Sequence, residues 1–219
     1  MKLYSGPLSM FGAKVEIALR EKGLDFDLEM VPYNRQVGYQ PKHPEVLRIN
    51  PKRQVPVLID GDTEIFDSTQ IFEYLEDRSP SPRLWPASPA ERARARQLEH
   101  ASDEVFFPHV IKLMGLRAEP DPVYAAEWIQ AREGIEQYYA KMAMQLKERA
   151  YLAGQLTYAD IAFYMAQFFA ARHTVPIPSA HSNLLAWRAR MAERPAVRQV
   201  VGAMVTYLKS IGLPIPDWG

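Results

Sequence analysis

Residues 50–77 read NPKRQVPVLIDGDTEIFDSTQIFEYLED, and this stretch decides how the first third of the chain folds. Two short apolar runs, residues 55–60 and 63–67, flank a Gly-Asp pair, which is the pattern of an antiparallel hairpin. Residues 68–78 follow with helical spacing, and Ser68 is a candidate N-cap for that helix. The apolar face of this helix contains Ile71, Phe72, Tyr74 and Leu75. The stretch therefore predicts a strand, a turn, a second strand and a helix.

The residues before this stretch contain another strand–helix–strand series. Residues 2–5 (KLYS) form a short apolar-aromatic run, and residues 10–24 (MFGAKVEIALREKGL) have helical spacing, with Gly23 as the stop. Residues 25–31 (DFDLEMV) alternate with the strand period, and the polar stretch after them has room for a short helix near residues 45–49. The expected order of strand, helix, strand, short helix, strand, strand and helix describes a small α/β domain.

A change of composition separates this region from the rest of the chain. Residues 79–89 (SPSPRLWPASP) contain four prolines, which is typical of a linker. Every long segment after them has helical periodicity, and none alternates with the strand period. We therefore predict an α/β domain over residues 1–79, a proline-rich linker over 80–89 and an all-helical domain of about five helices over 90–219.

The composition excludes several classes of function. With 219 residues, 47% of them hydrophobic, the chain can bury one large core or two smaller ones. Its 26 basic and 26 acidic residues balance, so we expect neither nucleic acid nor an anionic membrane as a partner. The sequence has no cysteine, which excludes disulfides, thiolate metal sites and a cysteine nucleophile.

Common catalytic and targeting motifs are also missing from the sequence. The five histidines have no metal-ligand spacing, so we expect no metal site. There is no P-loop, no GxGxxG and no GxSxG elbow. The N-terminus lacks the apolar run of a signal peptide, and no segment approaches the roughly 20 apolar residues of a membrane span. We therefore expect a cytoplasmic protein.

Residues 50–77 also carry the groups that could bind a peptide-like ligand. Pro56 stands at the entry to a predicted strand, where a cis Val55-Pro56 bond would present the backbone of Val55 to such a ligand. Asp67 and Ser68 stand where the hairpin ends and the helix begins. The free N–H groups of that helix terminus suit a ligand carboxylate, and Asp67 could pair with a ligand ammonium. Both residues would equally serve as an ordinary helix cap.

Residues 50–75 resemble the second half of the thioredoxin-like domain of the cytosolic glutathione transferases. The family pattern is roughly NP-x-G-x-VP-x-L followed by [ED]-S-x-x-I-x-x-YL. The chain fills its places with Asn50, Pro51, Val55, Pro56, Leu58, Asp67, Ser68, Ile71, Tyr74 and Leu75. Residues 3–24 are similar to the first strand, active turn and first helix of the same family. The resemblance implies a thioredoxin-like fold for residues 1–79.

The second predicted domain resembles the same family. Residues 151–164 (YLAGQLTYADIAFY) are similar to its FLAG-x-x-[ST]-x-AD segment, in which Thr157 and Asp160 would form a capping box. Residues 183–197 (NLLAWRARMAERPAV) are similar to its late W-x-x-R-x-x-x-RP segment. The resemblance thus covers nearly the whole chain in the family's order.

In serine-type members of the family, a hydroxyl lies five residues before the Lys-Val of the first helix. Ser9 holds that place before Lys14, and the resemblance implies that it donates a hydrogen bond to the sulfur of glutathione. Ser5 is the rival, because it stands where tyrosine-type members carry their hydroxyl. A turn or N-cap role would also account for Ser9. Whether the hydroxyl is that of Ser9 or that of Ser5, the resemblance implies that it stabilises a thiolate that glutathione supplies.

The resemblance assigns the rest of glutathione to a small set of residues. Val55, beside Pro56, would pair with the cysteinyl backbone, and Asp67 with Ser68 would hold the γ-glutamyl ammonium and carboxylate. Lys42 and Gln54 would bind the glycyl carboxylate. The alternative for Lys42 is an ordinary solvated lysine with no ligand. In the homodimer that the family implies, Asp103 would reach the glutathione of the neighbouring subunit.

The resemblance also implies a second, apolar substrate site between the two predicted domains. Its candidate lining residues are Leu8, Met10, Phe11, Phe106, Phe107, His109 and Met114. An apolar lining suits a small hydrophobic electrophile.

The function implied is conjugation of glutathione to such an electrophile, with glutathione as co-substrate and no metal. The absence of cysteine argues against members that reduce mixed disulfides. Two alternatives remain open: a non-catalytic glutathione-binding or regulatory protein of the same fold, and a specialised ether-cleaving, dehalogenating or isomerising enzyme.

Overall fold

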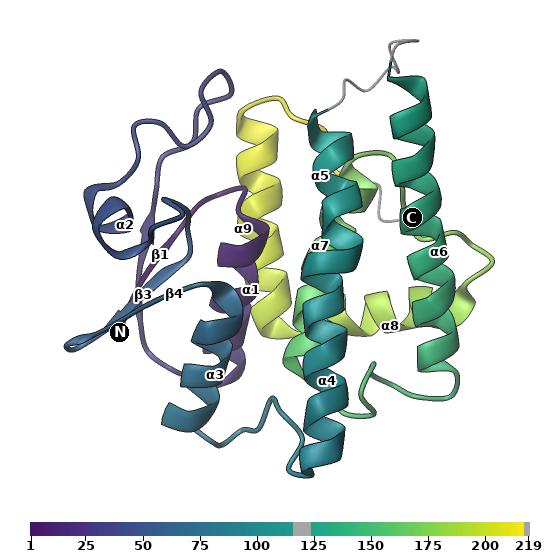
Figure 1. The fold of residues 1–219 in the computed structure, drawn as a ribbon, viewed down its shortest axis with the longest axis horizontal. Helices are drawn as coiled ribbons and strands as arrows, with labels where there is room; N and C mark the ends of the chain where they lie inside the picture. The colour runs from purple at the N-terminus through teal and green to yellow at the C-terminus, as the bar shows by residue number, and fades with distance from the viewer. Residues whose placement is uncertain (116–123, 217–219) are drawn as a thin grey trace. The chain divides into compact units, whose positions relative to one another are not determined.

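The computed structural model describes residues 1–115 and 124–216. Contacts between Cα atoms divide the chain into two compact units. The first unit consists of residues 1–83 together with 195–212, and the second of residues 84–194 and the residues from 213 on. Figure 1 gives the order of the helices and strands along the chain.

The first unit is built on a sheet of four strands in the order β2-β1-β3-β4. The strands are β1 (Lys2–Ser5), β2 (Asp27–Met30), β3 (Val57–Asp60) and β4 (Thr63–Phe66). β1 runs parallel to β2 and antiparallel to β3, and β3 pairs with β4 as the predicted antiparallel hairpin. In this register Tyr4 lies opposite Val57, which in turn lies opposite Phe66.

Helices cover both faces of this sheet. α2 (Pro44–Ile49) lies on one face, where Tyr4, Val31, Val46 and Val57 form a buried cluster. α1 (Met10–Glu21) and α3 (Ser68–Arg78) pack against each other on the other face. Side chains alternate along β1, so Leu3 and Ser5 face α1 while Tyr4 faces α2. The predicted strand and helix order of residues 1–79 is therefore confirmed.

The beginning of α3 differs from the prediction by one residue. Asp67 is the N-cap, because its side chain accepts hydrogen bonds from the N–H groups of Thr69 and Gln70. Ser68, the predicted cap, is the first residue of the helix. The aspartate carboxylate reaches these two N–H groups, which leaves the Ser68 hydroxyl outside the cap.

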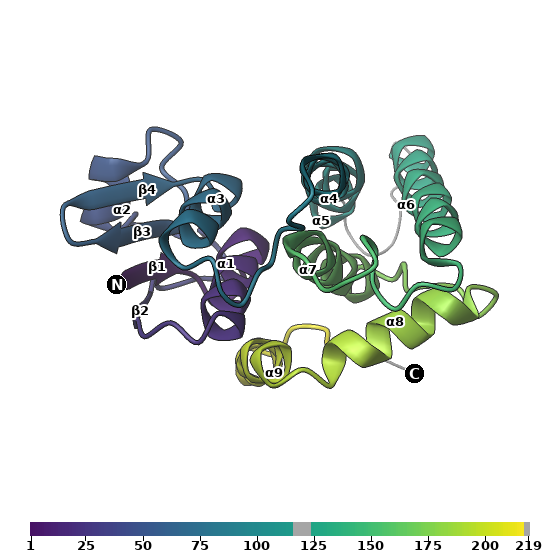
Figure 2. The ribbon, with the colours of Figure 1, turned by 90° about the horizontal axis from the view of Figure 1, so that it is seen from below.

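The last helix, α9 (Pro195–Ser210), belongs to the first unit and packs against α1 (Figure 2). Two side chains join it to the segment after β2: Tyr207 Oη donates to the Tyr33 carbonyl oxygen at 3.1 Å, and Arg35 Nη1 donates to the Ile211 carbonyl oxygen at 3.2 Å. The compact units therefore differ from the predicted division at 79/90, since the helical region 90–219 includes this helix.

In the described part of the second unit, all the regular secondary structure is helical. Its elements are α4 (Pro89–Ala101), the π-helical turn η1 (Ser102–Phe106), α5 (Phe107–Gly115), α6 (Ala125–Leu146), α7 (Tyr158–Arg172) and α8 (Ser182–Ala192). α7 packs against η1 and against α4, α5 and α8, which lie around it in Figure 2. Its residues 158–171 are all buried. No helix within residues 1–115 and 124–216 is long and apolar enough to cross a membrane.

The start of α7 matches the predicted capping box of Thr157 and Asp160. Asp160 is fully buried and accepts four hydrogen bonds. Oδ1 accepts from Leu152 N–H and Trp187 Nε1–H, both at 2.9 Å. Oδ2 accepts from the N–H and the hydroxyl of Thr157, at 2.9 and 3.1 Å. One carboxylate thus joins the loop before α7, the start of α7 and α8.

Candidate functional site

The turn between β1 and α1 holds Ser9 at the beginning of α1. Ser9 is the N-cap: its Oγ accepts a hydrogen bond from Gly12 N–H at 3.0 Å, and its own N–H donates to the Gly6 carbonyl oxygen at 3.0 Å. The capping bond uses a lone pair of the hydroxyl and leaves its proton available to a ligand. The first turn of α1 contains no acidic residue, so the partial positive charge of the helix terminus is not offset there.

Ser5 lies deeper than Ser9 and close to the same helix turn. Its side chain is 0% exposed, against 8% for Ser9, and its Oγ has no hydrogen-bond partner in the described chain. A Cβ built on Gly12 would lie 2.1 Å from Ser5 Oγ and 3.2 Å from Ser9 Oγ. The two serine hydroxyls therefore flank the backbone of Gly12, which has to lack a side chain. The greater exposure of Ser9 favours it over Ser5 as the hydroxyl that meets a ligand.

Tyr39 supports this turn from the segment between β2 and α2, and the sequence analysis did not identify it. Its hydroxyl accepts a hydrogen bond from Leu8 N–H at 2.9 Å. Its ring lies so close to Gly6 that a Cβ there would be 2.4 Å from a ring carbon. Burial raises the pKa of Tyr39 far above its ordinary value, so this phenol stays protonated. The sequence feature that could have pointed to such a contact is Gly6, because a glycine in a turn leaves room for a bulky ring to approach.

Val55 and Pro56 precede β3, and the peptide bond between them is cis, as predicted. Among the hydrogen bonds of the described residues, none uses the backbone N–H or C=O of Val55. Gln54 beside it is exposed, and its carbonyl oxygen accepts a hydrogen bond from Asn50 Nδ2. The backbone of Val55 is therefore available to pair with an extended ligand.

Asp67 and Ser68 stand at the junction of β4 and α3. Asp67 has a φ of 73° and a ψ of 127°, a backbone conformation that non-glycine residues seldom adopt. Its Oδ1 accepts from Thr69 N–H at 3.0 Å and from Gln70 N–H at 3.4 Å. Oδ2 makes no hydrogen bond with a described residue, and Ser68 is 3% exposed. The cap thus leaves acceptor capacity on the carboxylate.

The sheet register brings these three groups to one edge. Ser9 follows the carboxyl end of β1, and Tyr4 near that end lies opposite Val57 of β3. Because β3 is antiparallel to β1, Val55 and Pro56 precede β3 at this same edge. Phe66, the last residue of β4, also lies opposite Val57, so Asp67 and Ser68 follow it there. A hydroxyl, a free peptide unit and a carboxylate therefore share one edge of the sheet.

The remaining predicted glutathione ligands lie on other elements. Lys42 is half-buried and comes just before α2, whose N-cap is His43. No salt bridge to Lys42 is found within residues 1–115 and 124–216. Asp103 belongs to the second unit, where it is 8% exposed on the π-helical turn η1.

The predicted electrophile-site residues are divided between the two units. Leu8 and Met10 are buried in the first unit, and Phe11 beside them is half-buried. In the second unit, Phe106 is fully buried against Tyr138, Tyr139 and Phe163, and Phe107 contacts Phe169. His109 lies against Gly134 of α6, whereas Met114 is 43% exposed. Phe106 is therefore part of the hydrophobic core of the second unit.

His109 is the one histidine among these residues, and burial, together with the nearby charge of Lys112, lowers its pKa. Groups of three or more histidine, cysteine, aspartate or glutamate side chains that could hold a metal ion are absent from the part of the chain that the structure describes.

Comparison with protein families gives two matches in sequence order. The family model described as "Glutathione S-transferase, N-terminal domain" matches residues 3–83. The model described as "Glutathione S-transferase, C-terminal domain" matches residues 104–195.

Individual proteins with similar sequences carry two kinds of name. The chain is 30% identical to glutathione S-transferase 2 of Saccharomyces cerevisiae over 92% of its own length and 89% of that protein. It is 37% identical to a stringent starvation protein A homolog of Coxiella burnetii over 116 residues, which span 52% of the chain and about half (51%) of that protein.

A solved structure supports the same relationship. A glutathione S-transferase from Rhodospirillum rubrum F11 superimposes with a TM-score of 0.77 at 28% sequence identity. The superposition covers 91% of this chain and 90% of the other.

Proposed function

Because the chain belongs to the glutathione S-transferase family, we propose that it is an enzyme that transfers the thiolate of glutathione to a small hydrophobic electrophile. The observation that carries this proposal is the shared sheet edge, where a capping serine, an unpaired peptide unit and a carboxylate lie together. Glutathione is a peptide with a thiol, an ammonium and two carboxylates, so this combination of groups suits it.

In this proposal Ser9 stabilises the nucleophile. The Ser9 Oγ keeps the capping hydrogen bond that it accepts from Gly12 N–H, and its O–H donates a hydrogen bond to the sulfur of glutathione. A free thiol has a pKa of about 8.5, and lowering it by ~2 makes the thiolate the major form at pH 7. The N-terminus of α1 acts in the same direction, since its partial positive charge favours an anion.

The other groups orient glutathione around that sulfur. The Val55 N–H and C=O pair with the cysteinyl residue, and Pro56 fixes the chain beside it. Oδ2 of Asp67 receives the γ-glutamyl ammonium, while the N–H and hydroxyl of Ser68 bind its carboxylate. Lys42 and Gln54 bind the glycyl carboxylate.

The chemical step forms one bond and needs no protein nucleophile. The thiolate attacks the electrophilic carbon, a C–S bond forms, and the displaced electron pair leaves with the departing group or moves into the conjugated system. The apolar side chains of Leu8, Met10, Phe11, Phe106, Phe107 and Met114, with His109, are proposed to contact the electrophile. We further propose that the protein is a cytoplasmic homodimer in which Asp103 approaches the glutathione of the other subunit.

The ionisation of bound glutathione tests this assignment. We expect Ser9→Ala to raise the pKa of the bound thiol by on the order of 1–2, because a hydrogen bond to a charged group is worth roughly 1.5–3 kcal/mol. The titration is followed by thiolate absorbance in the glutathione complex. Ser5→Ala is the matched control and should leave the titration unchanged. A shift with Ser5→Ala and none with Ser9→Ala would transfer the role to Ser5.

A second candidate function is glutathione binding without turnover, in a regulatory protein of the same fold. The observation that favours it is the similarity to the stringent starvation protein A homolog of Coxiella burnetii. Retention on glutathione resin together with a conjugation assay on aromatic halides separates the two candidates. Retention without turnover on a broad panel of electrophiles favours the regulatory protein, and loss of retention removes both.

A further inference from the structure

Arg53 stands in the loop before Val55, in a backbone conformation that favours glycine. Its φ is 56°, in the left-handed region that residues with a Cβ adopt at a conformational cost. In the glutathione transferase pattern NP-x-G-x-VP, glycine holds this place. The chain therefore carries a long charged side chain where the backbone favours none, and such strained positions occur most often at binding sites.

Hydrogen bonds of Asn50 hold the Arg53 backbone in this conformation. Asn50 is 4% exposed, and its Oδ1 accepts from Lys52 N–H at 2.9 Å while its Nδ2 donates to the Gln54 carbonyl oxygen. The carbonyl oxygen of Asn50 accepts from Arg53 N–H at 2.8 Å. The loop is thus a closed turn, and Arg53 is exposed on it two residues before the free peptide unit of Val55.

The two cations of this loop have no acidic partner in the protein. Within residues 1–115 and 124–216, no salt bridge joins Lys52 or Arg53 to a carboxylate. The acidic side chains of the neighbouring α2 and β4 bind Arg48 instead. Arg48 Nη2 donates to Glu45 Oε2 at 2.7 Å, and Arg48 Nη1 donates to Glu64 Oε2 at 2.9 Å. The charges of Lys52 and Arg53 are therefore available to an anionic ligand.

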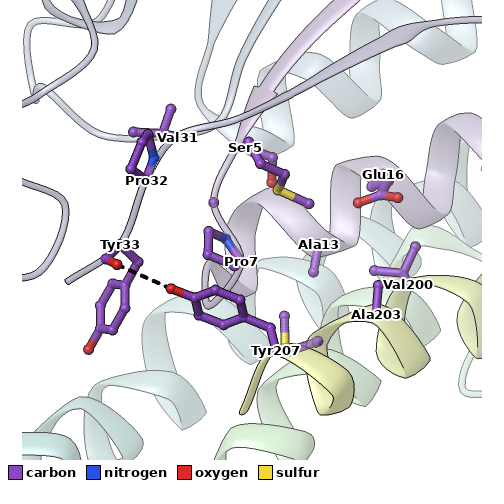
Figure 3. Close-up of a pocket in the computed structure, with 13 residues that line it drawn as sticks. Ser5, Pro7, Ala13, Glu16, Val31, Pro32, Tyr33, Val200, Ala203 and Tyr207 are labelled. Atoms are coloured by element: carbon purple, nitrogen blue, oxygen red, sulfur yellow. Dashed lines mark hydrogen bonds between the residues drawn. The ribbon is translucent and has the colours of Figure 1, made fainter. Parts of the chain in front are cut away.

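The segment that leads to Lys42, the proposed partner of the glycyl carboxylate, is held from two sides. Tyr207 Oη on α9 donates to the Tyr33 carbonyl oxygen at 3.1 Å, shown as the dashed line in Figure 3. The hydroxyl of Tyr39 accepts from Leu8 N–H at 2.9 Å. Because the backbone before Lys42 is fixed in this way, Lys42 can bind the glycyl carboxylate without help from the loop cations.

The inference rests on the proposed function, in which the glycyl end of glutathione lies beside Gln54. This end carries one negative charge, and Lys42 is enough to pair with it. We infer that Arg53, with Lys52 beside it, binds a second carboxylate there, so that the protein prefers a γ-glutamylcysteinyl peptide with an acidic last residue over glutathione itself. The planar guanidinium suits this role, since it binds a carboxylate through two parallel hydrogen bonds.

The test compares three S-methylated peptides by calorimetry with the full-length protein. They are glutathione, γ-glutamylcysteinylglutamate and γ-glutamylcysteinylglutamine. Methylation removes thiol ionisation from the comparison, and glutamine has the size of glutamate without its charge. We expect the glutamate peptide to bind about fivefold more tightly than either of the others, the size expected of exposed ion pairs. This preference should shrink between about 20 and about 500 mM sodium chloride, because salt screens exposed charges.

Substitutions at Arg53 locate the second carboxylate. Arg53→Gln removes the charge but keeps a long side chain at the positive φ, so the preference should fall to about twofold or less. Arg53→Lys restores the charge and should keep most of the preference. Arg83→Gln is the matched control, because Arg83 is an exposed arginine of the same unit outside the loops of the proposed site. Its preference should equal that of the wild type.

Arg53→Gly tests whether the arginine serves the ligand or the loop. Glycine adopts the positive φ freely, so this variant should unfold at a urea concentration at least as high as the wild type while it loses the preference. A lower midpoint together with an unchanged preference would give Arg53 a structural role and overturn the inference.

The peptide measurements separate this inference from the proposed function. Equal affinity for the glutamate and glutamine peptides, with S-methylglutathione still bound, would overturn the inference and leave the proposed function standing. A preference for the glutamate peptide that Arg53→Gln does not reduce would also refute the role of Arg53. Failure of all three peptides to bind would remove the proposed function and the inference together.

Discussion

The hydroxyl of Tyr39 accepts a hydrogen bond from Leu8 N–H at 2.9 Å, across 31 residues of sequence. The ring of the same tyrosine covers Gly6, two residues before Leu8. The segment after β2 therefore holds the turn that leads into Ser9 and α1. Tyr33 lies edge-on to Tyr39, with ring centroids 5.1 Å apart, and receives the hydrogen bond of Tyr207 from α9. Contacts between three tyrosines thus connect the last helix of the chain to the turn after its first strand.

We expect Tyr39→Phe to lower both stability and conjugation rate. The substitution keeps the ring over Gly6 but leaves the part-buried Leu8 N–H without an acceptor, which costs roughly 1–3 kcal/mol. A displaced turn also moves the Ser9 hydroxyl, so kcat/KM for glutathione should fall. Urea unfolding and steady-state kinetics measure the two effects. Tyr33→Phe is the control, because the hydrogen bond to Tyr33 uses its backbone carbonyl, and equal losses in both variants would contradict a specific role for Tyr39.

Gly12→Ala should destabilise the protein although it removes a glycine from a helix. In an open helix position, this change stabilises by about 0.5–1 kcal/mol. At Gly12 the new Cβ would lie 2.1 Å from Ser5 Oγ and 3.1 Å from Ser5 Cβ, so the fully buried serine has to move. We expect a net loss of about 1–3 kcal/mol in the free energy of unfolding, as for other overpacked sites.

Gly202→Ala on α9 is the matched control for Gly12→Ala. A Cβ at Gly202 meets nothing within 4 Å, so the ordinary stabilisation should appear there. Introducing Gly12→Ala into a Ser5→Gly background should recover part of the loss, because the colliding side chain is gone. Stabilisation at both glycines would show that Ser5 does not restrict Gly12.

Asp67 caps α3 and is proposed to bind glutathione, and a pair of substitutions can separate these two roles. Asp67→Asn keeps a capping oxygen and tolerates the positive φ of 73° better than most residues, so the free energy of unfolding should change by less than about 0.5 kcal/mol. It removes the charge proposed to hold the glutathione ammonium, so calorimetry should show weaker glutathione binding. Asp67→Ala should lose both functions, with about 1 kcal/mol of stability from the cap. Unchanged glutathione affinity in both variants would leave Asp67 as a cap alone.

The parts of the fold that depend on neighbouring residues in sequence could be predicted. The hairpin of residues 57–66 follows from two apolar runs around a Gly-Asp turn, and the Thr157–Asp160 capping box follows from spacing alone. The cap of α3 was predicted one residue late, because Asp67 and Ser68 are both good capping residues and local sequence does not separate them.

The parts that depend on distant contacts could not be predicted. The sequence does not say that Tyr39 meets Leu8, or that Ser5 crowds Gly12, because each pair is fixed by the sheet register and helix packing. The helical periodicity after the linker predicts helices, but it does not reveal the π-helical turn at Ser102–Phe106 between α4 and α5. Helical periodicity also assigned residues 195–210 to the helical domain, although their packing against α1 places them in the first unit.

The pH dependence of stability should carry a contribution from Asp160. Burial raises the pKa of its carboxyl from 3.8 to about 6, against four hydrogen bonds that favour the charged form. Between these values the folded state binds more protons than the unfolded state, so the stability contributed by Asp160 falls as the pH rises from about 4 to about 6 and is constant above that range. The size of the fall is on the order of 3 kcal/mol, since one pKa unit is worth about 1.4 kcal/mol.

The comparison of wild type with Asp160→Asn isolates this contribution of Asp160. Asparagine does not titrate in this pH range. In either orientation its NH₂ group meets two hydrogen-bond donors, those of Thr157 or those of Leu152 and Trp187. Because donors cannot pair with donors, the variant is less stable than the wild type at every pH. Urea unfolding between pH 4 and 7 should show the advantage of the wild type shrinking as the pH rises to about 6. The carboxyl ¹³C shift of Asp160 in labelled wild-type protein gives the same pKa if the variant does not fold. An advantage that grows with pH, or a carboxyl shift with its midpoint below pH 4, would mean that the four hydrogen bonds outweigh burial.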